Sequence, residues 1–230
     1  ACVLAKVDSS VDELMVLSGD APLLSGETTV DLLSKHRTSG SAITFLVSKL
    51  CPPDDMGRVI RDSKGNVSAI LEGVEGGLKG DEVNAGAYVF NLTWLREHLK
   101  QLAPQSNGET FLTDLIGLAY DNRVGVETVE SQDRWEALGV NTRVQMALAE
   151  AAMRDRICQR WMREGVSMLD PSSTFVEADV EIGQDTVIHA QTQIRGRTRI
   201  GRECEIGSQS SLFDSVIGDR CSVRASTLEG

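Results

Sequence analysis

Up to about residue 139, the hydrophobic positions alternate between two periods, with polar turn residues between the apolar runs. Residues 13–17 (ELMVL) and 41–50 (SAITFLVSKL) are short apolar runs, and the second is rich in β-branched side chains, as buried strands are. Residues 26–40 carry a helical pattern, with Ser25 placed to cap the beginning of the helix and Gly40 placed to end it. The pattern therefore predicts a strand, a helix and a second strand.

The next residues continue this alternation. Residues 58–72 predict a hairpin whose two strands flank a turn rich in Asp, Ser, Gly and Asn. The remaining predicted elements are a strand at 82–90, a helix from Thr93 to about Leu102, a helix within 108–122 and a strand at 124–130. Strands that alternate with helices at this spacing predict a three-layer α/β domain.

Residues 141–165 have a different composition, with Ala, Leu, Glu, Arg and Met throughout and no Pro. These residues predict one long helix, with Asn141 as its N-cap and Gly165 at the C′ position. The predicted helix separates the α/β half of the chain from a second half of another kind.

After Asp170 the hydrophobic period becomes six. Aliphatic residues recur six positions apart at Val176, Ile182, Ile188, Ile194, Ile200, Ile206 and Leu212, and Ile217 then comes one position early. A period of six fits neither a helix nor an alternating strand, and it is the signature of a hexapeptide-repeat parallel β-helix. Each coil would have three short strands with aliphatic side chains pointing inward, and His189, which follows an inward residue, is expected on the outer surface.

The composition is that of an ordinary globular protein, with 230 residues, 41% of them hydrophobic and 25% charged. No apolar run is long enough to span a bilayer, so no membrane partner is predicted. The formal net charge of −11 argues against sequence-independent binding to nucleic acid, because such binding needs a basic surface. The five cysteines are scattered, without a C-x-x-C pair, so neither a zinc site nor a disulfide framework is indicated, and a reducing cytoplasm fits best.

The stretch MVLSGDAPLL places a carboxylate, Asp20, directly after a predicted strand. A strand-to-loop turn is one explanation, because Gly and Asp are common turn residues and Pro22 ends a strand ladder. A metal or phosphate site is the other, because ligands of open α/β sheets bind beyond the carboxyl ends of the strands. This stretch alone leaves both explanations open.

An ordered set of motifs carries a resemblance that covers essentially the whole chain. The set consists of LSGDAPLL, GRVIRDSKGNVSAILE, EVNAGAYVF, NGETFLTDLIGLA, GVNTRVQMALAEAAMRDRI and the hexapeptides after VSMLDPSSTFVEADVEIG. With these motifs the chain resembles the bacterial family of bifunctional N-acetylglucosamine-1-phosphate uridylyltransferases and glucosamine-1-phosphate N-acetyltransferases. The resemblance implies a Rossmann-like nucleotidyltransferase domain at 1–140, a linker helix at 141–165 and a left-handed parallel β-helix at 166–230.

The resemblance also implies a reaction, a cofactor and a set of site residues. Sugar 1-phosphate would attack the α-phosphate of UTP and release pyrophosphate, with Mg²⁺ held by Asp20 and Asn141. Contacts to the nucleotide and the sugar would come from Ser18, Gly19, Asp20, Gly57, Glu72, Asn84 and Asn141, and Glu109, Phe111 and Thr113 would shape the sugar pocket. The chain departs from the family pattern at Ser18, often aromatic in the family, at Met56, where the family has tyrosine, and at Ala85, where it has threonine.

The implied substrates and product are UTP, N-acetylglucosamine 1-phosphate and UDP-N-acetylglucosamine, a precursor for peptidoglycan and lipopolysaccharide. The family is cytoplasmic and homotrimeric through the β-helix, and its second activity uses acetyl-CoA. The family's phosphate loop would precede Ala1 and its acetyltransferase coils would follow Gly230, so we expect the chain to be a fragment with little activity alone. The alternatives are another sugar-1-phosphate nucleotidyltransferase with a hexapeptide domain and a non-catalytic assembly subunit.

Overall fold

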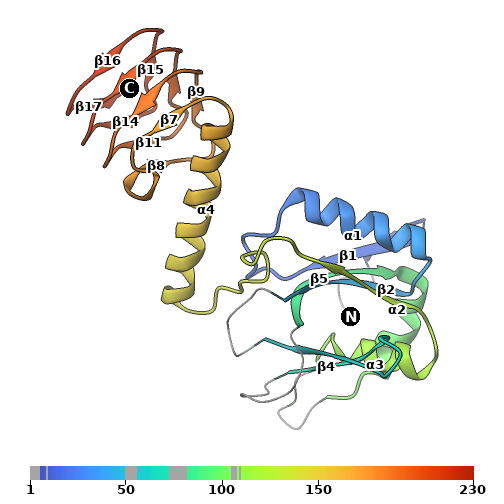
Figure 1. The fold of residues 1–230 in the computed structure, drawn as a ribbon. Coiled ribbons are helices and arrows are strands. Elements are labelled where there is room, and N and C mark those ends of the chain that lie inside the picture. Colours follow the sequence, from blue (N-terminus) through green and yellow to red (C-terminus); the bar gives the residue numbers. More distant parts are fainter. Residues whose placement is uncertain (1–5, 9, 50–55, 73–81, 105–107, 109) are drawn as a thin grey trace. The chain divides into compact units, whose positions relative to one another are not determined.

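The computed structural model describes residues 6–8, 10–49, 56–72, 82–104, 108 and 110–230. It divides the chain into two compact units, Ala1–Gln145 and Met146–Gly230 (Figure 1). No helix in the described part of the chain is both long and apolar enough to cross a membrane.

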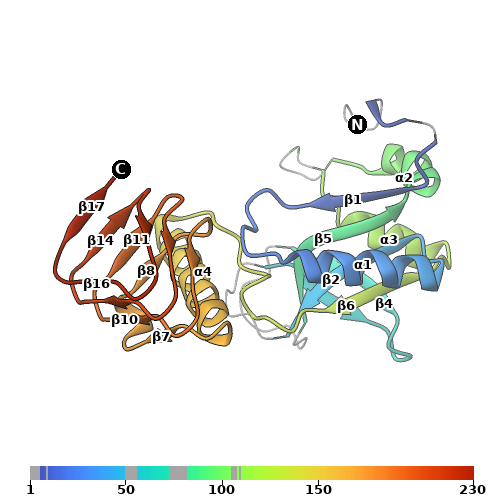
Figure 2. The same cartoon turned by 90° about the horizontal axis from the view of Figure 1, so that it is seen from above.

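The first unit is built on a mixed sheet of six strands in the order β4-β3-β5-β2-β6, with β1 paired to β5 (Figure 2). The strands are β1 (Glu13–Leu17), β2 (Ile43–Ser48), β3 (Arg58–Arg61), β4 (Val67–Leu71), β5 (Val83–Asn91) and β6 (Val126–Glu130). β6 runs parallel to β2, and the other pairs are antiparallel. Every residue of β2 is buried, as its continuous apolar run predicts.

Helices cover both faces of this sheet, which confirms the predicted three-layer architecture. On one face, α1 (Gly26–Ser39) places Leu32 in a core cluster with Ala87 and Val89 of β5. On the other face, Tyr88 and Phe90 of β5 belong to a larger cluster with α2 (Leu92–His98) and α3 (Asp114–Asp121). Alternate residues of one strand therefore enter opposite cores, as the pleat of a strand requires.

The predicted caps of α1 are confirmed. The Ser25 hydroxyl accepts a hydrogen bond from the Thr28 amide, and Gly40 ends the helix in the left-handed conformation. The helix predicted from Thr93 to about Leu102 is found as α2 followed by the 3₁₀ turn η2 (Leu99–Gln101). The helix predicted within 108–122 begins only at Asp114, and Leu112 and Thr113 just before it form a turn.

His36, in the last turn of α1, is buried, and its Nδ1 atom lies 2.9 Å from the Thr44 hydroxyl. Burial lowers the pKa of the His36 imidazole below its ordinary value of 6.5, against the opposing charge of Glu13. The unfolded chain therefore binds this proton at a higher pH than the folded chain does. The contribution of neutral His36 to the free energy of unfolding is expected to be complete above the pKa that His36 has in the unfolded chain. It should diminish as the pH falls below that value toward the lower pKa of the folded state.

Thermal unfolding at about pH 7.5 and about pH 5.5 measures this effect, since the two conditions lie on either side of the ordinary histidine pKa. His36→Asn retains a polar group near Thr44 and cannot take up the proton. We expect the variant to lose less stability on acidification than the wild type. An equal loss in both proteins would show that His36 does not cause the pH dependence.

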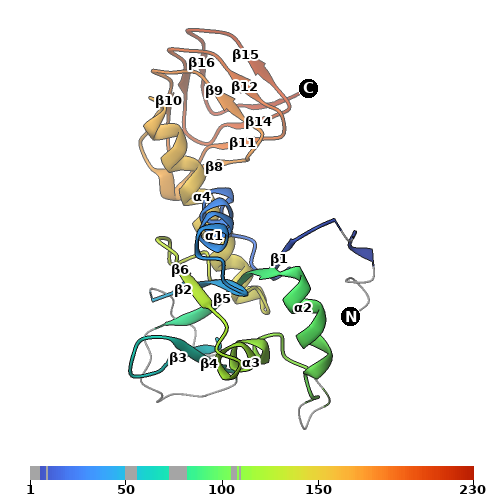
Figure 3. The same cartoon turned by 90° about the vertical axis from the view of Figure 1, so that its right-hand side faces the viewer.

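The second unit begins within α4 (Arg143–Arg163) and continues as a parallel β-helix, whose stacked coils are seen in Figure 3. Gly165 has a φ of 95° at the C′ position, and the Val166 amide donates to the Trp161 carbonyl, so the predicted C-terminal cap is confirmed. The first strand of the β-helix, β7 (Ser167–Met168), is followed by the 3₁₀ turn η3 (Pro171–Ser173). With the later strands it forms three parallel sheets, β7-β10-β13-β16, β8-β11-β14-β17 and β9-β12-β15.

The strands of the β-helix are two or three residues long. They are β7 (Ser167–Met168), β8 (Phe175–Val176), β9 (Glu181–Ile182), β10 (Val187–Ile188), β11 (Gln193–Arg195), β12 (Arg199–Ile200), β13 (Glu205–Ile206), β14 (Ser211–Phe213), β15 (Val216–Ile217), β16 (Ser222–Val223) and β17 (Thr227–Glu229). Ile194 pairs with Val176 before it and Leu212 after it, so one coil takes three hexapeptides. The seven predicted inward aliphatic residues are all buried.

A second ladder, two positions before each aliphatic residue, was not predicted. Its members are buried, and most are hydroxyl residues: Thr174, Val180, Thr186, Thr192, Thr198, Cys204 and Ser210. The Thr186 hydroxyl donates to the Gly201 carbonyl of the next coil, and the Thr198 hydroxyl donates to the Arg195 carbonyl. The hydroxyl groups of these two residues are thereby paired with backbone carbonyls at the corners of the coils.

Candidate functional site

The loop after β1 brings Asp20 against the chain segment that precedes α4. The Ser18 amide donates to the Gly86 carbonyl at 2.9 Å, which holds the loop beside the middle of β5. The Val140 amide donates to the Asp20 carbonyl at 2.8 Å. Two segments far apart in the sequence are therefore joined by backbone hydrogen bonds within the first unit.

Asp20 and Asn141 converge over Gly139. A Cβ atom at Gly139 would lie 3.4 Å from the Asp20 Oδ2 atom and 3.8 Å from the Asn141 Nδ2 atom. Among the described residues, neither side chain has a hydrogen-bond partner, and Asp20 and Asn141 are both exposed. The two side chains thus share a small open space above a residue that has no side chain to fill it.

Asn141 is not the N-cap of α4, so that part of the prediction is wrong. Thr142 is the cap, because its hydroxyl accepts from the Gln145 amide at 3.2 Å. The Gln145 Oε1 atom in turn accepts from the amides of Asn141 and Thr142, at 2.8 Å each. This reciprocal capping box leaves the Asn141 side chain without a capping role.

The hairpin of β3 and β4 places Glu72 directly over Gly57. A Cβ atom at Gly57 would lie 2.7 Å from Glu72 Oε1 and 2.8 Å from Ile70 Cγ2, so only glycine permits this approach. The Gly57 carbonyl accepts from the Asn84 amide at 2.8 Å, which ties the beginning of the hairpin to β5. Partial desolvation raises the pKa of the Glu72 carboxyl, and the charge of Asp114 raises it further.

The Asn84 side chain is oriented by two hydrogen bonds. Its Oδ1 atom accepts from the Gly86 amide at 3.1 Å, and its Nδ2 atom donates to the Tyr88 hydroxyl at 2.6 Å. Tyr88 is buried, and burial raises the pKa of its phenol well above the ordinary value. A second amide hydrogen of Asn84 remains available to a ligand.

These side chains line one pocket of about 170 Å³. Six of the predicted contact residues line it, namely Ser18, Asp20, Gly57, Glu72, Asn84 and Asn141, whereas Gly19 does not. Phe111 and Thr113 are not among the lining residues, and Glu109 lies outside the described residues. The residues where the chain departs from the resemblance, Ser18, Met56 and Ala85, all line the pocket.

Sequence reasoning missed five further lining residues: Ala21, Gly86, Ala137, Gly139 and Gln145. Small residues between two motifs give little indication in the sequence that they line a pocket. The spacing of Thr142 and Gln145 just before a helical run is a capping-box pattern, and it could have identified both the true cap and the side chain beside the pocket.

The described lining residues include two carboxylates, Asp20 and Glu72, and no Lys, Arg or His. Within the described part of the chain, no group of three or more His, Cys, Asp or Glu residues could hold a metal ion. One carboxylate and one amide oxygen nevertheless fit Mg²⁺, which takes few protein ligands and completes its octahedron with water and phosphate oxygens. Asp20 and Asn141 would supply such oxygens over Gly139, with the Asn141 amide turned so that its Oδ1 atom takes the place of Nδ2.

A buried carboxylate, Glu136, anchors the segment that leads to Asn141. It accepts hydrogen bonds from the Ser25 amide, from the Thr28 hydroxyl at 2.7 Å and from the Ser131 hydroxyl at 2.5 Å. These donors belong to the beginning of α1 and to the residues after β6, so Glu136 links two sides of the unit.

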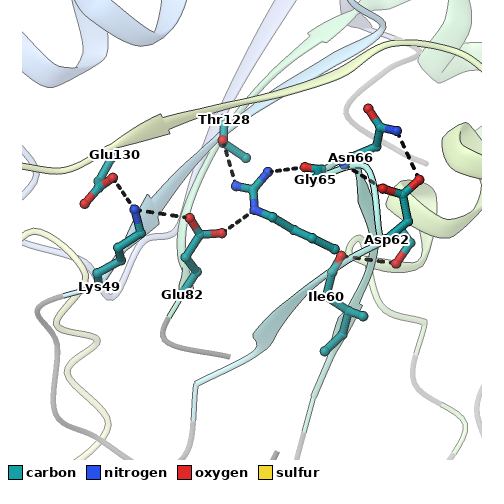
Figure 4. Close-up of polar contacts among 10 residues, drawn as sticks. Lys49, Ile60, Asp62, Gly65, Asn66, Glu82, Thr128 and Glu130 are labelled. Carbon is teal, nitrogen blue, oxygen red and sulfur yellow. Dashed lines mark hydrogen bonds and ion pairs between the residues drawn. The ribbon is translucent and has the colours of Figure 1, made fainter. Parts of the chain in front are cut away.

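An ion-pair network supports the β3–β4 hairpin, which pairs with β5 through a single residue pair (Figure 4). Glu82 lies 2.6 Å from the Arg61 Nε atom and 3.6 Å from the Lys49 Nζ atom. Lys49 also pairs with Glu130, and Arg61 donates to the Thr128 hydroxyl at 3.1 Å. Linked ion pairs of this kind hold the hairpin, and hence Gly57 and Glu72, against the main sheet.

The first unit is thus an α/β domain with an open polar pocket, and the second is a β-helix built of hexapeptides. The family model of nucleotidyl transferases matches residues 2–153, and that of bacterial transferase hexapeptides (six repeats) matches residues 179–213. The chain belongs to the nucleotidyl transferase family.

Curated relatives extend this comparison. The chain is 37% identical over 232 residues to the bifunctional protein GlmU of Trichlorobacter lovleyi, and the match covers 99% of the chain and 50% of the relative. It is 39% identical over 221 residues to the protein of the same name from Caldanaerobacter subterraneus, with 94% and 48% covered. The chain spans about half the length of the curated relatives it matches.

A solved structure described as a glucose-1-phosphate thymidylyltransferase from Bacillus anthracis shares the fold. The TM-score is 0.52 at 21% identity, with 64% of this chain and 56% of that chain covered.

Proposed function

We propose that the pocket catalyses Mg²⁺-dependent transfer of UMP from UTP to N-acetylglucosamine 1-phosphate. The products are UDP-N-acetylglucosamine and pyrophosphate. The observation that supports this most directly is the convergence of Asp20 and Asn141 over Gly139, in a chain 37% identical to a relative named bifunctional protein GlmU. Neither side chain has a structural partner among the described residues, which favours a role toward a ligand.

A phosphate oxygen of the sugar substrate attacks the α-phosphorus of UTP, and the bond from that phosphorus to the pyrophosphate oxygen breaks. Reactions of this kind need positioning and charge neutralisation more than covalent catalysis. Asp20 and Asn141 would hold Mg²⁺, which when bound neutralises charge on the α-phosphate. The loop at Ser18 and Gly19, held on β5, orients the nucleotide next to them.

The sugar is bound by the opposite side of the pocket. Glu72, held over Gly57, accepts hydrogen bonds from sugar hydroxyls, and a carboxylate makes short, strong bonds of this kind. Asn84 donates its second amide hydrogen to the sugar substituent. Its orientation is set by Gly86 and Tyr88 before the substrate arrives, which lowers the entropic cost of binding.

The activity and assembly of the whole protein are also proposals. The relatives are named bifunctional, so we propose that the native protein also acetylates glucosamine 1-phosphate with acetyl-CoA. The hexapeptide β-helix supports a homotrimer, and we propose a cytoplasmic enzyme that supplies UDP-N-acetylglucosamine for the cell wall. Ser18, Met56 and Ala85 line the pocket and depart from the family pattern, which favours another sugar 1-phosphate as the second candidate substrate.

Pyrophosphate release in the native full-length protein tests the proposal. UTP, ATP, CTP and dTTP would each be combined with N-acetylglucosamine 1-phosphate or glucose 1-phosphate, with and without Mg²⁺. Release that needs UTP, the N-acetylated sugar and Mg²⁺ together supports the proposed reaction. Release with another pair assigns the protein to a sister activity, and no release with any pair supports a non-catalytic assembly subunit.

Gly57→Ala is expected to raise the KM for the sugar phosphate about tenfold, because the added Cβ displaces the Glu72 carboxylate and one charged hydrogen bond is lost. Gly117→Ala is the matched control, since nothing lies within 4 Å of a Cβ at that position in α3. Steady-state kinetics of both variants measure the effect. A normal KM in Gly57→Ala would show that Glu72 does not bind the sugar from this position.

A further inference from the structure

Gln145 is held in the first turn of α4 with its side chain at the wall of the pocket. Its Oε1 atom accepts three hydrogen bonds, from the amides of Asn141 and Thr142 and from the Thr142 hydroxyl at 3.1 Å. The side chain is therefore fixed by the backbone of the residue that precedes the cap.

These contacts also decide which way the Gln145 amide points. A backbone amide can only donate, so the atom that meets two of them must be the carbonyl oxygen. The Nε2 atom, with two hydrogens, is consequently turned away from the cap. Among the described residues it has no hydrogen-bond acceptor.

The pocket needs donors of this kind. Asp20 and Glu72 make its described lining acidic, and no described lining residue is Lys, Arg or His. A phosphate that enters the pocket is repelled by these carboxylates unless a cation and neutral N–H groups compensate. Nε2 of Gln145 supplies two such N–H groups at a fixed position beside Asn141.

We propose that Gln145 is a substrate-binding residue whose Nε2 donates to a phosphate oxygen of the nucleotide or the sugar phosphate, while its Oε1 holds the Asn141 backbone. The proposal rests on the proposed function and adds to it a contact that carries no charge. The two roles of Gln145 account for its place in the capping box, which leaves the Asn141 side chain free to line the pocket.

Gln145→Glu separates the two roles, because glutamate completes a capping box as well as glutamine does but has no N–H group and carries a negative charge. We expect Gln145→Glu to unfold at the wild-type temperature. Either its affinity for UTP with Mg²⁺ should fall roughly ten- to a hundredfold, or its KM for the sugar phosphate should rise by the same factor. Gln145→Ala should lose both stability and binding.

Thr142→Ala is the matched control for capping alone, since it removes the cap hydroxyl and leaves the Gln145 amide in place. We expect a lower unfolding temperature and UTP affinity within about twofold of the wild type. Isothermal titration calorimetry with UTP and Mg²⁺, thermal unfolding and steady-state kinetics in the native full-length protein provide the measurements.

Wild-type UTP affinity and wild-type KM in Gln145→Glu would overturn the proposal and leave Gln145 as a helix cap only. Failure of the proposed function has a different signature. In that case the wild-type protein itself would bind no UTP in the presence of Mg²⁺, and Asp20→Ala would change nothing.

Discussion

Asp20→Ala is expected to lower the rate of pyrophosphate release about a thousandfold or more, the size of effect seen when a preorganised electrostatic contact to the transition state is removed. Asp20 is the carboxylate that converges with Asn141 over Gly139, and the described lining of the pocket has no cation to replace a lost metal ion. Without a bound Mg²⁺ ion, the negative charges of UTP and of the sugar phosphate repel each other. The folded state should be unaffected, because the carboxylate makes no hydrogen bond with a described residue.

The measurement is Mg²⁺-dependent release of pyrophosphate by the native full-length protein, with thermal unfolding of the same samples. Asn141→Ala should lose activity in the same way, and Asp20→Asn should lose somewhat less because an oxygen ligand remains. Asp31→Ala is the control, since Asp31 is an exposed carboxylate on α1. Full activity in Asp20→Ala would remove the metal role and leave Asp20 as a turn residue.

Glu136→Ala is expected to lower the free energy of unfolding of the first unit by about 3–5 kcal/mol. The substitution leaves the Ser25 amide and the hydroxyls of Thr28 and Ser131 without their shared acceptor. Glu136 is only 2% exposed, so water cannot easily replace it. The segment that Glu136 anchors also carries Gly139 and Asn141, so catalysis should weaken with the fold.

Chemical denaturation followed by circular dichroism measures this loss in the transition of the first unit. Glu130→Ala is the control, because Glu130 forms an exposed pair with Lys49 that is expected to contribute less than about 1 kcal/mol. Glu136→Gln retains one oxygen acceptor, so its loss of stability should lie between those of Glu136→Ala and Glu130→Ala. A change of less than about 1 kcal/mol in Glu136→Ala would show that the three donors find other partners.

Several parts of the fold follow from local sequence rules. The six-residue period predicts the β-helix because each coil repeats the same inward position, and the seven aliphatic residues at that spacing, from Val176 to Leu212, are buried as expected. The ends of α1 are predictable because Ser25 and Gly40 act on backbone groups within four residues of themselves. The strands β1 and β2 follow from short apolar runs.

The cap of α4 shows where N-cap propensity alone fails. Asn141, Thr142 and the residues after them are all acceptable at a helix N-terminus, so propensity cannot choose between Asn141 and Thr142. The capping-box spacing of Thr142 and Gln145 favours Thr142, and the Val140 amide, which donates to the Asp20 carbonyl from a distant loop, holds the backbone just before it. With the backbone held there, Thr142 meets the Gln145 amide and the Asn141 side chain is released toward the pocket.

The sequence by itself determined the succession of strands and helices along the chain, the six-residue repeat and the family resemblance that implies Asp20 and Asn141 as site residues. Only the tertiary structure showed that these two side chains meet over Gly139, that Glu72 rests on Gly57 and that Glu136 anchors the segment before Asn141. The physical reason is the range of the interactions. Hydrophobic period, helix caps and turns depend on residues a few positions apart, so they produce recognisable sequence patterns. The pocket is formed by contacts between segments far apart along the chain, and such contacts produce no local pattern.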